Sequence, residues 1–198
     1  EYSKVALDTV AIVGMITAIF AASVALVQND IKKIIAYSTC SQLGYMFFAA
    51  GIGAYHVAIF HLFTHAFFKA LLFLGSGCVI HSFKEEQDIR LMGGVWYKIP
   101  YTYILMIIGT LALTGFPFLS GYYSKDAIIE FAYLKGNLIG YSAAIVGIFT
   151  AFLTSIYSWR LIFKTFHGKY KYKKESIKSL KESSLIMLIP CSLLAVGA

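Results

Sequence analysis

Apolar residues along this chain gather into runs of roughly 20 residues or more, the length an α-helix needs to cross a bilayer. Short polar or basic segments separate the runs. The pattern predicts six membrane spans, at residues 8–28, 31–51, 54–82, 101–134, 138–166 and from 183 onward. We therefore expect an all-α polytopic membrane protein, a transmembrane helix bundle that forms a single domain over residues 1–198.

The composition supports a membrane location. The chain is 59% hydrophobic and 14% charged, whereas soluble domains are nearer to about 45–50% apolar and about 25% charged. No signal-peptide pattern precedes the first run, the chain does not begin with Met, and it ends inside an apolar run. We expect both ends to continue in a longer protein or to be completed by a second chain.

The basic residues predict an orientation. Most of the 17 lysines and arginines lie in segments that would share one side of the membrane, near residues 32–33, 84–98 and 164–182. The positive-inside rule places this side in the cytoplasm or the mitochondrial matrix. We interpret the basic loop 164–182 as a solvated segment near anionic lipid. Nucleic acid is not an expected partner, because the basic residues form no extended water-facing patch.

Three ionisable residues, His61, His65 and Lys69, interrupt the third apolar run at a spacing of four. On an α-helix this spacing produces one slowly winding polar stripe about 12 Å long. A lysine at the membrane centre costs roughly 2.5–3.5 kcal/mol on insertion scales, so ionisable groups there usually have a function. The stripe predicts proton transfer, because imidazole exchanges protons near neutral pH and a water can bridge one turn.

Two other interpretations of the histidines stay open. Histidines spaced by four also bind zinc in hydrolases, but those carry a Glu beside the first His, and no third ligand is evident here. A structural role, with hydrogen bonds between helices, is the second. Three cysteines, Cys40, Cys78 and Cys191, form no CxxC pair and predict neither a disulfide framework nor a metal or iron–sulfur site.

The fourth run is too long for one straight helix, and the segment GFPFLSG interrupts it. Pro117 has no amide hydrogen, so we predict a broken helix there. Lys125 and Asp126 follow the break, and Glu130 lies one turn further on. Irregular backbone at membrane depth lines a cavity or is buried in protein, so the break indicates an ion or proton site. Two short helices with an interfacial loop are the alternative.

Further polar residues lie near these groups in the expected bundle. We predict that they support the path as interhelical hydrogen bonders or water anchors. They are Ser38, Gln42 and Tyr45 in the second run, and Ser124 and Glu130 after the break.

Three segments of the chain resemble one family closely. NDIKKIIAYSTCSQLGYMFFA, FHLFTHAFFKALLFLGSGCVIH and GFPFLSGYYSKDAIIE are similar to the antiporter-like subunit 5 of respiratory complex I, called subunit L in bacteria. The resemblance covers roughly residues 8–167 and implies the later part of the second of two inverted repeats. It also implies that His61, His65 and Lys69 belong to a proton path, and that Lys125 and Asp126 form its exit.

The resemblance implies a function and a setting. The chain would be a proton-translocating membrane-arm subunit of NADH:ubiquinone oxidoreductase, with NADH, FMN, iron–sulfur clusters and ubiquinone on other subunits. It would carry no cofactor itself, although a bound phospholipid stays open. Expected partners are membrane-arm subunits, including the antiporter-like subunit 4, and a second chain that supplies the first repeat if the gene is split.

The expected location is the mitochondrial inner membrane, with the bacterial plasma membrane as the alternative. Two other functions stay open. The chain could be the large subunit of a multi-subunit Na⁺/H⁺ antiporter, which carries a comparable HAFFKA segment. It could also be a non-conducting scaffold within the membrane arm.

Overall fold

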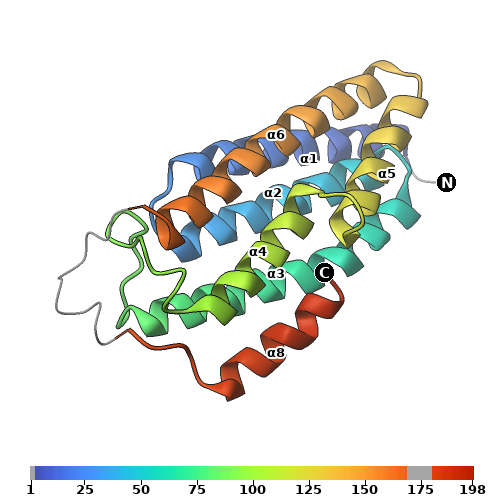
Figure 1. Ribbon diagram of the computed structural model, residues 1–198. Coiled ribbons are helices and arrows are strands. Elements are labelled where there is room, and N and C mark those ends of the chain that lie inside the picture. The colour runs from blue at the N-terminus through green and yellow to red at the C-terminus, as the bar shows by residue number, and fades with distance from the viewer. Residues whose placement is uncertain (1–2, 169–179) are drawn as a thin grey trace.

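The computed structural model describes residues 3–168 and 180–198. These residues form seven α-helices, and no strand occurs among them (Figure 1). The helices are α1 (Lys4–Val27), α2 (Ile31–Gly51), α3 (Tyr55–Ser82), α4 (Pro100–Thr114), α5 (Ser120–Leu134), α6 (Leu138–Phe166) and α8 (Leu185–Val196). The predicted all-α bundle is confirmed, and the fourth apolar run forms two helices, α4 and α5, separated by a break.

Three helices, α1, α3 and α6, are long and apolar enough to cross a membrane by length and composition, while α4 and α8 are shorter apolar helices. Large apolar side chains point outward from the long helices: Phe63 is 64% exposed, Ile16 62% and Phe152 61%. Polar side chains of α3 and α6, such as His61, Lys69 and Thr154, face inward. This arrangement suits a hydrocarbon surrounding, in which apolar surface carries no cost and polar groups find partners inside the bundle.

Helices α1 and α2 approach very closely through small residues. A Cβ atom built on Gly44 would lie 2.5 Å from the backbone nitrogen of Ala18, and one on Gly14 would meet the backbone of Phe48. At this contact, Ser41 Oγ donates a 2.9 Å hydrogen bond to the Ala18 carbonyl. Small residues that let two backbones approach, with a hydroxyl bridging them, are typical of helix pairs in membranes.

Polar contacts fasten the end of the bundle that carries the basic segments. Arg160 of α6 donates hydrogen bonds to the Gln28 carbonyl at 2.6 Å and to Asn29 Oδ1 at 2.7 Å, in the α1–α2 turn. In the loop between α3 and α4, Arg90 forms a 2.6 Å ion pair with Asp88. Hydrogen bonds from Arg90 hold the pKa of Asp88 below its usual value. Most of the predicted basic loop 164–182 lies outside the described residues.

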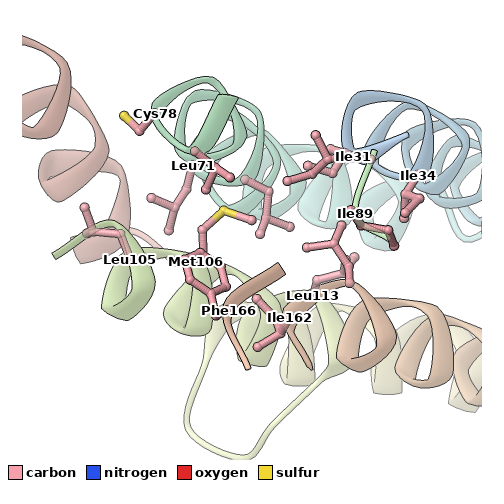
Figure 2. Packing of buried hydrophobic residues seen from close by; sticks show 14 of the residues in the cluster. Ile31, Ile34, Leu71, Cys78, Ile89, Leu105, Met106, Leu113, Ile162 and Phe166 are labelled. Carbon is pink, nitrogen blue, oxygen red and sulfur yellow. The ribbon is translucent and has the colours of Figure 1, made fainter. Parts of the chain in front are cut away.

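An apolar core fills the bundle between this end and its middle. Figure 2 shows Leu71 of α3, Met106 of α4 and Ile162 and Phe166 of α6 in this cluster, together with Ile89 from the α3–α4 loop. All five side chains are almost fully buried. The core therefore fixes α3, α4 and α6 relative to one another, and this positions the buried polar groups described next.

Candidate functional site

The three ionisable residues of the α3 stripe all face the bundle interior. His61 is fully buried, His65 is 6% exposed and Lys69 is 4% exposed. Of the apolar residues between them, Leu62 and Phe63 point outward, whereas Phe68 is buried. The helical spacing read from the sequence therefore places the ionisable groups on one inward face, in contact with α2 and α5.

His61 is held on both sides by hydrogen bonds. Its Nε2 lies 3.1 Å from Gln42 Oε1 of α2, and its Nδ1 lies 2.9 Å from Ser124 Oγ of α5. An amide oxygen only accepts, so Nε2 carries the hydrogen of the neutral ring. Thr64 Oγ1 donates to Ser124 Oγ at 3.0 Å, which leaves the Ser124 hydroxyl hydrogen for Nδ1. The ring is thus joined to α2 and α5 at once.

His65 is close to this group without being bonded to it. The centroids of the His61 and His65 rings lie 6.0 Å apart. His65 packs edge-on against Phe68, at 5.4 Å and 84°. Its Nε2 is buried and has no hydrogen-bond partner among the described residues. A proton moving between the two imidazoles would therefore need a bridging water.

Lys69 begins a chain of hydroxyl groups. Its Nζ donates to Ser38 Oγ of α2 at 2.5 Å, and Ser38 Oγ lies 2.6 Å from the Tyr157 hydroxyl of α6. Tyr157 donates to Thr154 Oγ1 at 3.4 Å, and Thr154 donates to the Thr150 carbonyl at 2.8 Å. Because Tyr157 donates its one hydrogen to Thr154, it accepts from Ser38, and every donor in the chain points away from Lys69.

The predicted supporting residues of α2 divide into two kinds. Ser38 and Gln42 join the networks at Lys69 and His61. Tyr45 is buried, but its hydroxyl donates to the backbone carbonyl of Gly147 on α6. This contact ties α2 to α6 and leaves Tyr45 outside both networks.

The helix break is closed by Lys125, which is 3% exposed. Its Nζ donates to the carbonyl of Leu113, in the last turn of α4. The side chain of Leu113 in turn lines a small cavity beside Lys69. The amine of Lys125 thus lies inside the bundle, near the region of Lys69, whereas the break residues Phe116, Pro117 and Phe118 are exposed.

The two carboxylates near the break face outward. Asp126 and Glu130 are both exposed and line a groove of about 370 Å³ between α5 and α6. Consecutive residues of an α-helix point about 100° apart, so Asp126 points away from the direction of Lys125. Within the described residues Asp126 forms no ion pair with Lys125. The structure therefore places Asp126 and Glu130 on an outer face and not in the networks of His61 and Lys69.

Several residues of the networks were not predicted from the sequence. Thr64 is one, and Thr154 and Tyr157 of α6 are two others; Ser158 of α6 lines the cavity beside Lys69 without joining a network. Together with Thr150, two of these α6 residues have the same spacing of four as His61, His65 and Lys69. That spacing in the sequence could have indicated a polar stripe on α6. It is weak evidence, because a single hydroxyl in an apolar helix often bonds the backbone of its own helix, as Thr154 does.

The described residues bring no three His, Cys, Asp or Glu side chains together in a way that could hold a metal ion. Of the cysteines, Cys78 and Cys191 are buried in the apolar core and Cys40 is exposed. The chemistry that the site supports is therefore argued from its imidazoles, amines and hydroxyls alone.

Comparison with known proteins places the chain in a class that agrees with this site. A family model described as "NADH:quinone oxidoreductase/Mrp antiporter, TM" matches residues 1–156. The chain belongs to this family of membrane proteins.

Individual relatives are more specific. The chain is 54% identical to NADH-quinone oxidoreductase subunit L of Rhodobacter capsulatus over 100% of its length, which is 29% of that protein. It is 53% identical to NADH-ubiquinone oxidoreductase chain 5 of Dictyostelium citrinum over 99% of its length, again 29% of the relative. The resemblance to subunit 5 stated from the sequence is confirmed, and the chain spans less than a third of these relatives.

The fold has a counterpart among solved structures. A chain of the membrane-bound sulfane sulfur reductase, an archaeal respiratory membrane complex, superposes with a TM-score of 0.84 at 27% identity. The match covers 95% of this chain and 30% of the other. The helical arrangement is therefore shared with a subunit of a respiratory membrane complex.

Proposed function

We propose that this chain moves protons through the membrane arm of an NADH:quinone oxidoreductase. The observation that carries the proposal is the position of Lys69, an amine buried inside a membrane bundle and bonded to a chain of hydroxyls. A buried lysine with no carboxylate partner is costly to keep charged. It therefore loses and regains its proton when nearby charges change, which is what a proton carrier must do.

The proposed roles follow the contacts. His61 and His65 relay protons along α3, and Lys69 is the central carrier. Lys125 is the gate towards the exit: when it leaves the Leu113 carbonyl, it can deliver its proton to the outer groove at Asp126. Asp126 receives the proton because it lies at that surface, with Glu130 one turn further on.

The setting belongs to the proposal. NADH, FMN, iron–sulfur clusters and ubiquinone would be bound by other subunits, whose redox chemistry drives the charge movement. The partners would be membrane-arm subunits, including the antiporter-like subunit 4, and the part of subunit 5 that this chain does not contain, within one protein or as a second chain. The lipid around the bundle would be the mitochondrial inner membrane or the bacterial plasma membrane.

The test uses the assembled complex in sealed vesicles, with Lys69→Ala as the variant. We expect proton translocation to fall at least tenfold per NADH oxidised, because the carrier is lost. The control is Lys135→Ala, which removes a lysine bonded to the Ile52 carbonyl outside both networks. Unchanged translocation with Lys69→Ala, in a complex of normal composition, would favour a scaffold without a proton path.

A second candidate is a sodium/proton antiporter, because the matching family includes the Mrp antiporters. The same vesicles distinguish the two functions. The complex I function predicts NADH-driven proton movement that does not need sodium. Proton movement driven by a sodium gradient in the absence of NADH would establish the antiporter instead.

A further inference from the structure

A small cavity lies beside the amine of Lys69. Its volume is about 10 Å³, which is enough for one water molecule if two to four polar groups surround it. Polar residues from four helices line it: Ser38 of α2, Lys69 of α3, Thr110 of α4, and Tyr157 and Ser158 of α6. The rest of the wall is apolar, with Ile34, Ile35, Leu72, Leu113 and Leu161.

Ser158 is the residue that points to a ligand in this cavity. It is 4% exposed, and its hydroxyl has no hydrogen-bond partner among the described residues. Buried hydroxyls in native proteins are almost always paired with protein or with ordered water. Because Ser158 lines the same cavity as Lys69, one water there can bond both groups.

Lys69 has room for this bond. An ammonium has three donors, and among the described residues Ser38 is the partner that accepts from it. The hydroxyl chain beyond Ser38 ends on the Thr150 carbonyl. A backbone carbonyl has no proton to exchange, so this chain orients the amine but offers no exit. Besides the hydroxyl chain, the polar groups that line the cavity are the ones that lie beside the Lys69 amine.

The cavity lies nearer to the basic end of the bundle than to the opposite end, as the positions of Ser38 in α2 and Ser158 in α6 show. Its apolar residues Ile34, Ile35 and Leu161 lie nearer to the basic ends of α2 and α6 than Ser38 and Ser158 do. In the last turn of α6, at that end, Thr165 is another buried hydroxyl without a partner among the described residues. Buried apolar residues of the core, among them Ile31, Ile162 and Phe166, separate the cavity from the basic end.

We propose that Ser158 holds a water molecule against Lys69 Nζ, and that this water exchanges protons between Lys69 and the basic side of the membrane. The water donates one proton to the neutral amine and regains one from the next water on the basic side. In the reverse direction the ammonium gives its proton to the water, which passes one on. This inference rests on the proposed function of Lys69.

The first test is a structure of the assembled complex at a resolution that shows ordered water. We expect one water within hydrogen-bond distance of both Ser158 Oγ and Lys69 Nζ. A cavity that is empty, or closed by a side chain, would overturn the inference whatever the complex transports.

The second test measures proton translocation by Ser158→Ala in vesicles. We expect a loss of about three- to tenfold, the effect of one hydrogen bond, with normal assembly. As the pH on the basic side is raised, the translocation rate of Ser158→Ala should begin to fall at a lower pH than that of the wild type. The reason is that Lys69 takes up protons more slowly in the variant. Ser76→Ala is the control, since the Ser76 hydroxyl is already bonded to the Phe73 carbonyl at 2.7 Å.

In a third variant, Ser158→Val, the larger side chain fills the cavity and should lower the rate of proton translocation further. If the complex that carries Ser158→Val does not assemble, the result for Ser158→Ala still decides the test. Normal rates and pH profile in Ser158→Ala, combined with lost translocation in Lys69→Ala, would overturn this inference alone. No effect of Lys69→Ala would instead overturn the proposed function.

Discussion

Lys125 donates a hydrogen bond to the carbonyl of Leu113, across the break that separates α4 from α5. The last carbonyls of a helix lack partners within it and carry the negative end of its dipole. At the end of α4, backbone amides of the break already bond the carbonyls of Leu111 and Ala112. Lys125 completes this cap, so the same amine that is proposed as a gate also holds the break closed.

The cap predicts a loss of stability when the amine is removed. Lys125→Met leaves the Leu113 carbonyl buried and unpaired, at a cost of about 1–3 kcal/mol. The assembled complex should therefore melt at a lower temperature in a thermal unfolding assay. Asp126→Asn is the control and should melt as the wild type does, because Asp126 is exposed and forms no ion pair with Lys125 in the described residues. An equal loss in both variants would show that the charge pair matters more than the cap.

The close approach of α1 and α2 predicts different outcomes for two glycines. In Gly44→Ala the added methyl would meet the backbone of Ala18, so the helices must separate, at a cost of about 1–3 kcal/mol or more. In Gly77→Ala nothing lies within 4 Å of the new Cβ, and the higher helix propensity of alanine is worth up to about 1 kcal/mol. Thermal unfolding should show destabilisation in the first variant and none in the second. The reverse order would refute this packing.

The bonds of His61 predict a contrast between two serines of α5. Ser124→Ala removes the hydrogen-bond partner of His61 Nδ1, whereas Thr64 Oγ1 keeps the His61 carbonyl as its acceptor, so both stability and proton translocation should decrease. The stability loss should be about 1–3 kcal/mol, because a buried imidazole nitrogen is left unpaired. Ser120→Ala removes a buried hydroxyl that has no partner among the described residues, so neither quantity should fall. Equal behaviour of the two variants would mean that Ser124 does not orient His61.

Much of the fold could be predicted from the sequence, because helix length and apolar runs are read directly in a membrane protein. The break at Pro117 was predicted for the same reason: a residue without an amide hydrogen interrupts the helix. The inward stripe of His61, His65 and Lys69 followed from the helical spacing alone.

The partners of these groups could not be predicted, because they depend on how the helices pack. Lys125 and Asp126 are adjacent in the sequence and were predicted to form one exit, whereas helical geometry directs the two side chains to different faces. The partner of Lys69 is Ser38 from another helix, joined through Tyr157 to a third. Hydroxyls such as Ser158 gave little signal, since a single serine in an apolar helix is common.

The most direct test of the central claim is the number of protons translocated per NADH oxidised by the assembled complex that carries Lys69→Arg. Arginine keeps the positive charge but does not release its proton in proteins. If Lys69 carries protons, this ratio should fall as it does for Lys69→Ala, although the charge is retained. A ratio equal to that of the wild type would show that Lys69 serves as a fixed charge, and would contradict its role as a carrier.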